Sequence, residues 1–490
     1  MNKEIAIIVL PIGAAFVSIL LRSSKADRAA LILVSLINLT ASMTLPYDGV
    51  FRNNELLGTD TLGFVFLFII NVNFLGSALY SNVYLKETDE AQHYDHWYAP
   101  AMLFFLAMVT GAVLSRNLGL MWVFVGATPI ATATLIWHHR DKESLEAAWK
   151  HLFICSVGIV LSFIGVLSMV EASEQVPGRG LSIDTLSNYT ALISPLWGGM
   201  AFTFALVGYG TMMGLSPMHT WLPDAHSKAP SSASAMFSGT LLNCAFLAIL
   251  RYYQIFAFTP MISFIRNLML ALGLLSILAA AVFIPRVDNF KRKLAYSTVG
   301  HMGILATSVG LGGIAIYAAM LHTLCHSLIK HALFLTSGNF LYTYGTVKTS
   351  GISNAIGRVP QSSIILVVSV LFIIGIPPSG LFVSEFMMIK QMVTESRWVV
   401  LAVFVVLSAT VSYGFITSVF KMVFSEAATE MSKEAGAATP DEGSSEATVE
   451  PLFSLLPQWI FLGIIAITGI YIPLALNVLL HRAAYILGGF

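Results

Sequence analysis

A row of ionisable residues stands in an otherwise apolar stretch, LHTLCHSLIKHALFLTSGN, where His322, His326 and Lys330 recur at every fourth position. This spacing places all three on one face of a helix. A lysine in apolar surroundings releases its proton readily and histidine titrates near neutral pH, so the row could pass protons along the helix. Two alternatives stay open. The side chains could serve only as structural hydrogen-bonding groups, or the two histidines could bind a metal, although no carboxylate or thiol lies on that face.

Two further residues could extend this proton relay. Glu385, in GLFVSEFMMIK, is the one carboxylate that the pattern places deep inside an apolar span. It could accept a proton near an exit, or it could be the structural partner of a basic residue. His301, in LAYSTVGHMG, could belong to the relay or be a hydrogen-bonded core histidine. Proton transfer is therefore the chemistry that these residue types favour.

A second polar group occupies VGYGTMMGLSPMHTWLPDAHSKAP, which contains His219, Asp224 and His226 among prolines. We expect Asp224 and His226 to lie near the cytoplasmic surface, where an aspartate could also cap a helix. His219 lies nearer the membrane and is the better relay candidate. The stretch has the polar content of a proton entry site.

The elements that position these residues are membrane helices. Hydrophobic residues make up 56% of the 490-residue chain and charged residues 11%, and the mean hydropathy is +0.78, far from the values of soluble domains. About fourteen apolar runs recur, each long enough to cross the hydrocarbon core of a bilayer as a helix. The predicted fold is an all-α polytopic membrane protein with spans at about 4–22, 29–46, 62–86, 97–114, 117–137, 149–171, 192–214, 232–258, 263–285, 294–312, 314–343, 362–391, 398–424 and 453–480.

Two of these spans contain helix-breaking residues well inside the apolar run. The seventh is interrupted at Pro217 and Pro223, and the twelfth at GIPPSG, residues 375–380. Broken helices survive at membrane depth where protein or a water-filled cavity satisfies the freed backbone groups. The breaks lie five helices apart, and this odd offset predicts two inverted five-helix repeats, an arrangement typical of transporters. The predicted units are 1–96, 97–258 (helices 4–8), 259–424 (helices 9–13), an acidic cytoplasmic loop at 425–452, and 453–490.

Charge and cysteine content exclude several classes of function. The formal net charge is zero, which gives no indication of a nucleic-acid partner. Cys155, Cys244 and Cys325 each stand alone in an apolar run, and no cofactor-binding motif is present, so we expect this chain to carry no cofactor. Loops on one side hold about twice as many Lys and Arg residues as those on the other, which places the N-terminus outside a cell (inner) membrane.

The motifs SPMHTWLPDAHSKAPSSASAMFSG, NFKRKLAYSTVGHMG, HTLCHSLIKHALFLTSGN and GIPPSGLFVSEF resemble those of the antiporter-like proton-channel subunits shared by respiratory complex I, Mrp cation antiporters and group 4 membrane-bound hydrogenases. The stretches LLNCAFLAILRYY and AWKHLFICSVGIVLSFIG are most similar to the F-type membrane subunit of hydrogenase-4. The resemblance implies about fourteen helices with two inverted five-helix units. It also implies that each half-channel uses a lysine in the broken seventh helix, a carboxylate from the fifth, a central Lys or His, and an exit Lys or Glu in the twelfth.

The sequence departs from that pattern in its first half. Gly126 stands where the family motif usually has Glu, and Met212 where it usually has Lys. Asn243 occupies a position that is Lys in many relatives, and Gly300 one that is often Glu. Glycine and methionine carry no exchangeable side-chain proton, so the entry half-channel is degenerate.

We therefore expect a proton-translocating membrane subunit of a hydrogenase-4-like or complex I-like redox complex, itself non-catalytic. Its expected partners are other membrane subunits, a soluble redox arm, membrane lipid and protons, with sodium as a second candidate ion. Two alternatives stay open: a non-conducting scaffold or coupling subunit of the same complex, and a cation antiporter module without redox partners.

Overall fold

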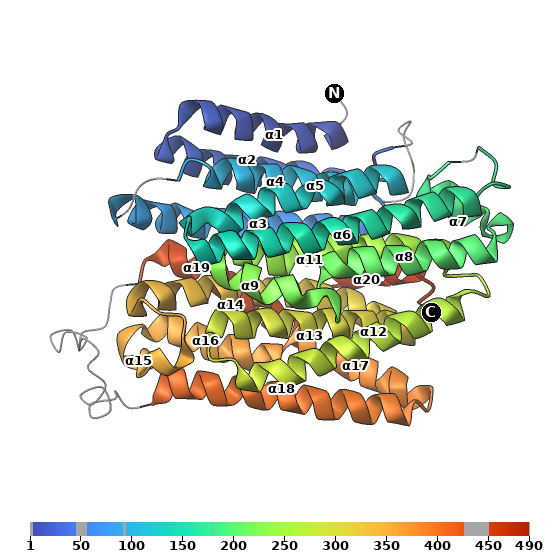
Figure 1. Cartoon of the computed structure of the whole chain (residues 1–490). Helices are drawn as coiled ribbons and strands as arrows, with labels where there is room; N and C mark the ends of the chain where they lie inside the picture. Colours follow the sequence, from blue (N-terminus) through green and yellow to red (C-terminus); the bar gives the residue numbers. More distant parts are fainter. Residues whose placement is uncertain (1–2, 46–55, 92–94, 179, 426–449, 490) are drawn as a thin grey trace.

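The computed structural model describes residues 3–45, 56–91, 95–178, 180–425 and 450–489, and these residues form a bundle of helices lying side by side (Figure 1). No strand occurs in this described part, which contains only isolated β-bridges. The predicted all-α class is therefore confirmed. The predicted acidic loop at 425–452 lies almost entirely outside the described residues.

The helices of the first part follow the predicted spans closely. They are α1 (Lys3–Leu21), α2 (Ser24–Met43), α3 (Thr61–Ala91), α4 (Tyr98–Leu114), α5 (Leu118–Ile136), α6 (Lys142–Ala172), α7 (Ile183–Asn188), α8 (Pro195–Met213), α9 (Trp221–Lys228), α10 (Ser231–Met236) and α11 (Leu242–Phe256). A single turn of π-helix, η4 (Phe237–Leu241), joins α10 to α11, so the predicted eighth span is one continuous helical rod with a local bulge.

The second part contains α12 (Ile262–Phe283), α13 (Phe290–Leu311), α14 (Ile314–Tyr344), α15 (Ala355–Arg358), α16 (Pro360–Ile373), α17 (Gly380–Thr394), α18 (Trp398–Phe424), α19 (Leu452–Ile470) and α20 (Leu474–Ile486). The predicted last span is wrong in one respect, because it is divided between α19 and α20. Pro473 supplies no backbone donor and stands immediately before α20, where a new helix starts. Ten helices of the described residues are long and apolar enough to cross a membrane, so the count of fourteen stays a prediction.

The first predicted break is confirmed at Pro217. Helix α8 ends at Met213, Gly214 takes a left-handed conformation (φ 78°), and the chain passes through η3 (Met218–Thr220) before α9 starts. The expectation for Pro223 is wrong. This proline lies in the first turn of α9, where the donor that it lacks has no intrahelical partner in any case.

The second predicted break is also confirmed. Helix α16 ends at Ile373, Gly375 has φ 78°, and α17 begins at Gly380. The side chain of Ser379 accepts a hydrogen bond from the backbone N–H of Phe382 and so caps the new helix. Both breaks therefore combine a glycine in the left-handed region with one or two prolines a few residues beyond the end of the preceding helix.

Each predicted five-helix unit contains its break at the same place. The first unit corresponds to α4, α5, α6, the α8–α9 pair and the α10–α11 rod, and the second to α12, α13, α14, the α16–α17 pair and α18. The broken helix is the fourth member in both. The unit boundaries and the inverted relation between the units remain predictions.

Candidate functional site

Lys330 lies in the middle of the bundle on α14, with no exposed surface. Its ammonium group donates hydrogen bonds to the carbonyl oxygen of Leu294 at 2.9 Å and to the hydroxyl of Ser297, both on α13. Within the described part of the chain, Lys330 forms no ion pair. Because no carboxylate holds it in the ammonium form, this amine is suited to giving up and regaining a proton.

Three histidines gather next to this lysine. The ring centroid of His326 lies 5.0 Å from that of His301 on α13 and 6.2 Å from that of His322 on its own helix. Nδ1 of His301 and Nε2 of His322 are 3.1 Å apart. Both ring nitrogens of His326 are buried and have no hydrogen-bond partner among the described residues. The structure thus brings His301 to the predicted row of His322 and His326.

A serine on α17 fixes the hydrogen-bond direction in this cluster. The hydroxyl of Ser384 donates to the carbonyl oxygen of Leu381 at 2.7 Å, so it accepts from Nδ1 of His322 at 2.9 Å. Neutral His322 then carries its lone pair on Nε2, which accepts the hydrogen from Nδ1 of His301. A directed chain of hydrogen bonds therefore joins α13, α14 and α17.

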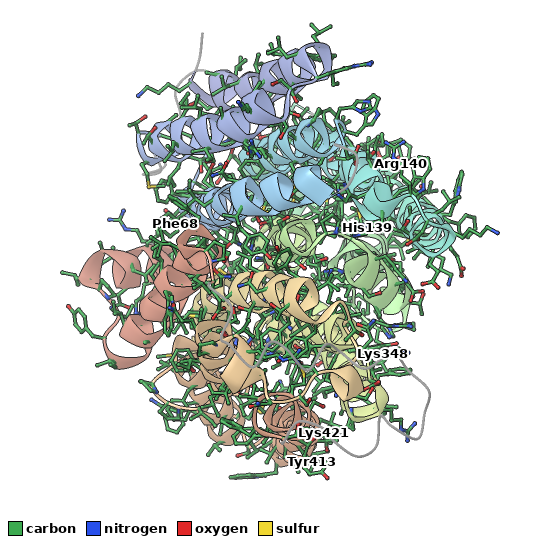
Figure 2. All side chains as sticks on the ribbon, turned by 90° about the vertical axis from the view of Figure 1, so that its left-hand side faces the viewer. Phe68, His139, Arg140, Lys348, Tyr413 and Lys421 are labelled. Atoms are coloured by element: carbon green, nitrogen blue, oxygen red, sulfur yellow. The ribbon has the colours of Figure 1, made fainter. Side chains whose placement is uncertain are left out.

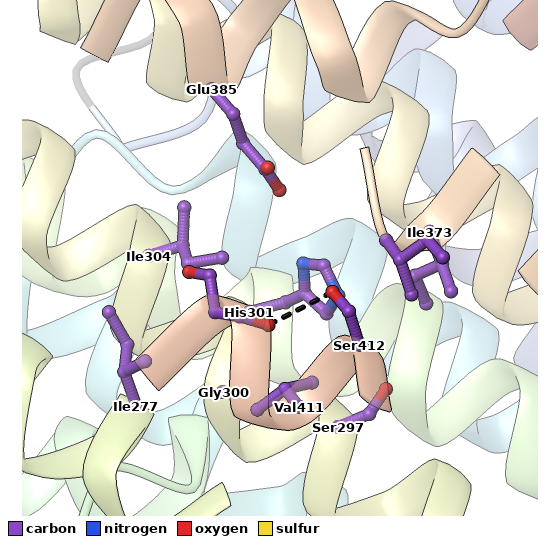
Figure 3. A pocket seen from close by; sticks show the side chains of 11 residues that line it. Ile277, Ser297, Gly300, His301, Ile304, Ile373, Glu385, Val411 and Ser412 are labelled. Carbon is purple, nitrogen blue, oxygen red and sulfur yellow. Dashed lines mark hydrogen bonds between the residues drawn. The ribbon is translucent and has the colours of Figure 1, made fainter. Parts of the chain in front are cut away.

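Glu385 approaches the same cluster from α17. One carboxylate oxygen lies within 4.8 Å of a ring nitrogen of His301 and of His322. Figure 3 shows Glu385 directed toward His301 across a cavity that Ser408 and Ser412 of α18 also line. The cavity measures about 30 Å³, enough for about one water molecule. Glu385 forms no ion pair within the described residues, so the structure does not support the alternative of a structural partner for a basic residue.

The residues around the first break do not form one cluster. His226 has no exposed surface. Its Nδ1 lies 3.0 Å from the carbonyl oxygen of Leu222, its Nε2 has no partner in the described part, and the rings of Phe237 and Phe334 flank it. His219 is almost buried beside the rings of Phe283 and Tyr296.

Asp224 has a different environment, because it is partly exposed and forms two ion pairs. It lies 3.3 Å from the ammonium of Lys150 on α6 and 2.9 Å from the guanidinium of Arg292 on α13. The alternative of a helix cap is wrong, since Thr220 stands at the cap position of α9. The carboxylate therefore connects helices of both predicted units.

The positions that we predict to depart from the family pattern differ in their surroundings. Met212 is 1% exposed. A Cβ atom at Gly126 would lie 3.4 Å from the side chain of Ile159, and one at Gly300 would lie only 2.9 Å from Cβ of Ala280. Asn243 donates a hydrogen bond to Ser327 on α14 at 2.5 Å. Gly300 thus permits close packing of α13 on α12, a structural reason for a small residue there.

Two further buried histidines, His331 and His151, were not predicted as site residues. Nε2 of His331 lies 2.7 Å from the hydroxyl of Ser77 on α3, and Nε2 of His151 lies 2.7 Å from the hydroxyl of Thr132 on α5. Their sequence signal was an ionisable residue inside an apolar run, but neither follows the four-residue spacing of the row on α14. Both have a hydrogen-bonded partner, unlike His326.

Residues 115–412 match the family described as "NADH:quinone oxidoreductase/Mrp antiporter, TM", which covers more than half of the chain. The chain belongs to this family. A hydrogenase-4 component F homolog from Methylacidiphilum infernorum is 32% identical over 420 residues, which cover 83% of this chain and 84% of that protein. The chain is thus an antiporter-like membrane subunit of the hydrogenase-4, complex I or Mrp type, and the predicted family is confirmed.

Solved structures share the fold of this family member. A chain of a membrane-bound sulfane sulfur reductase, an archaeal respiratory complex, superposes with a TM-score of 0.85 at 20% identity and covers 100% of this chain and 98% of its own. A chain of respiratory complex I from Thermus thermophilus gives 0.81 at 19% identity, with 99% and 100% covered. At these identities the likeness establishes the fold alone.

Proposed function

We propose that this subunit translocates protons through its second half. The path runs from Lys330 to His326, then through the His322 and His301 pair, and reaches Glu385 beside the cavity. The observation that carries the proposal is the position of Lys330, which is fully buried, has no ion-pair partner among the described residues and stands at one end of a row of buried histidines. Intramembrane ionisable residues are functional by default.

Proton entry uses an altered route in this proposal. Met212 and Gly126 replace the titratable pair that relatives use, so the first half cannot run the same charge-coupled cycle. His219, Asp224 and His226, around the break between α8 and α9, are the proposed access residues. Loss of both members of the pair avoids leaving one buried charge unpaired, which costs about 3–5 kcal/mol.

We further propose that the subunit works in a cell (inner) membrane beside other membrane subunits and a soluble redox arm that supplies the driving reaction. Lys348, Lys421 and Arg140 lie at one end of the bundle, which Figure 2 views directly. The N-terminus lies toward the opposite end (Figure 1). Because basic residues are retained on the cytoplasmic side, this arrangement supports an N-terminus outside.

The experiment replaces Lys330 by methionine in the full complex, reconstituted in proteoliposomes. Removing the central amine should lower the number of protons taken up per electron transferred, while electron transfer itself continues. Lys390→Met, which changes an exposed lysine on α17, is the matched control and should leave the ratio unchanged. An unchanged ratio in Lys330→Met would sink the proposal.

A second candidate function is a non-conducting scaffold or coupling subunit. The specific observation in its favour is the apolar burial of Met212 in place of a titratable residue. This candidate predicts that Lys330→Met changes neither the ratio nor electron transfer. A third candidate, a redox-independent cation antiporter module that exchanges protons or sodium, predicts exchange in proteoliposomes that contain no redox partner.

A further inference from the structure

We propose that His301, His322 and Glu385 form a binding site for a divalent transition-metal ion, with Zn²⁺ as the ion that fits best. The three residues come from α13, α14 and α17, and each offers one ligand atom. These atoms all lie within 4.8 Å of one another. Neither spacing along the sequence nor the resemblance indicates this site, because it exists only where the three helices pack together.

The two imidazoles already have the separation that zinc requires. Zinc binds histidine nitrogen at about 2.0–2.1 Å in tetrahedral geometry, so two such nitrogens lie about 3.3 Å apart. Nδ1 of His301 and Nε2 of His322 are 3.1 Å apart. Only the carboxylate of Glu385 has to approach, and the cavity that it lines leaves room for its side chain to move.

The hydrogen bonds around the two histidines allow each ring to offer a nitrogen lone pair to an ion. Ser384 accepts the hydrogen from Nδ1 of His322 and leaves Nε2 of that ring with a free lone pair, as the outer partners of metal-binding histidines do. The hydrogen on Nδ1 of His301 moves to Nε2 of the same ring when the ion binds. The cavity of about 30 Å³ that His301 and Glu385 line has room for a water as the fourth ligand.

The donor set selects the class of ion. Two nitrogens and one carboxylate oxygen suit zinc, whereas magnesium and calcium prefer oxygen ligands throughout. The thiol on α14, that of Cys325, does not join these donors. It contacts the hydroxyl of Thr468 on α19 at 3.5 Å and so faces a different helix.

Zinc at this site would occupy three groups of the proposed proton path and block it. This consequence rests on the proposed function, whereas binding of the ion does not. The two are therefore measured separately.

The binding experiment titrates Zn²⁺ into the full chain in lipid nanodiscs and records the zinc X-ray absorption spectrum of the bound ion. We expect one tight site with nitrogen and oxygen neighbours at about 2.0–2.1 Å. His322→Gln and Glu385→Gln should each weaken binding by tenfold or more. Ser384→Ala, which keeps all three ligands, should weaken it about tenfold. His481→Gln removes an exposed histidine on α20 and is the matched control.

Equal affinity in the parent, His322→Gln and Glu385→Gln overturns the site, as does a spectrum with sulfur neighbours.

The second measurement adds Zn²⁺ to the reconstituted complex and follows proton uptake per electron. Zinc should lower the ratio in the parent at concentrations that fill the site. If zinc binds through these ligands while the ratio stays constant, the block and the proposed path are wrong although the site itself stands.

Discussion

Gly300 and Gly126 differ in how much space the structure leaves for a Cβ atom. Gly300 lies where α13 crosses α12, and a Cβ atom there would come within 2.9 Å of Cβ of Ala280. At Gly126 the nearest side chain, that of Ile159, would be 3.4 Å from the added atom, which is an ordinary contact. We expect relatives to have a carboxylate at both positions, and only Gly300 has a packing reason to be small.

Gly300→Ala should therefore destabilise the protein by about 1–3 kcal/mol, because an overpacked contact pushes the two helices apart. Gly126→Ala is the matched change and should be neutral or stabilising by up to about 1 kcal/mol, since alanine favours helix over glycine. The thermal unfolding midpoint in detergent measures both. Equal midpoints for the two variants would show that the contact at Gly300 relaxes freely.

The sequence predicts the individual residues of the site, but it does not predict that they lie together in the folded protein. The four-residue spacing puts His322, His326 and Lys330 on one helix face, and the structure has them on α14 as expected. That His301 and Glu385 converge on the same face depends on how α13 and α17 pack against α14, which no local pattern records. The sequence therefore singled out His301, His322 and Glu385 one by one, and the metal-binding alternative that it left open paired His322 with His326 instead.

At the scale of elements, glycine and proline mark both broken helices, and the predictions at Pro217 and at residues 375–380 are confirmed. A lone proline is a weaker signal. Pro223 fits into a first turn, whereas Pro473 starts a new helix, and only the surrounding packing distinguishes the two.

One ion pair fastens the start of α3 to α11. Arg251, which is almost buried, donates from both terminal nitrogens to the carboxylate of Asp60 at 2.6 and 2.7 Å. The backbone N–H of Gly63 adds a bond to the same carboxylate at 2.7 Å. Burial alone would raise the pKa of Asp60, but the charge and hydrogen bonds of Arg251, with the bond from Gly63, hold it below its ordinary value.

Asp60→Asn should lower the free energy of unfolding at neutral pH by about 3 kcal/mol, because it leaves the buried Arg251 without its ion-pair partner. A carboxylate with a lowered folded pKa stabilises the protein above its unfolded pKa of about 3.9, and this stabilisation disappears as the pH falls through the lower folded value. The parent and the variant should therefore differ above about pH 5 and converge in stronger acid. A difference that is constant down to about pH 2 would contradict this role.

At the scale of the whole molecule, we predict two half-channels of unequal composition. Family membership and fold agree with the sequence-based prediction, since apolar runs, helix breaks and polar motifs are all local features. Sidedness and the altered entry route depend on the surrounding membrane and on partner chains, so they remain proposals. The central claim concerns the two halves of the molecule. The half that contains Lys330 moves protons, whereas the other half does not use position 212, occupied by Met212, for proton transfer.

The most direct test compares Lys330→Met with Met212→Leu in the reconstituted complex, by protons taken up per electron transferred. Met212→Leu conserves volume and should cost less than about 1.5 kcal/mol of stability, so a folded protein is expected. We predict a lower ratio in Lys330→Met and the parental ratio in Met212→Leu. A parental ratio in Lys330→Met, or a loss confined to Met212→Leu, would contradict it.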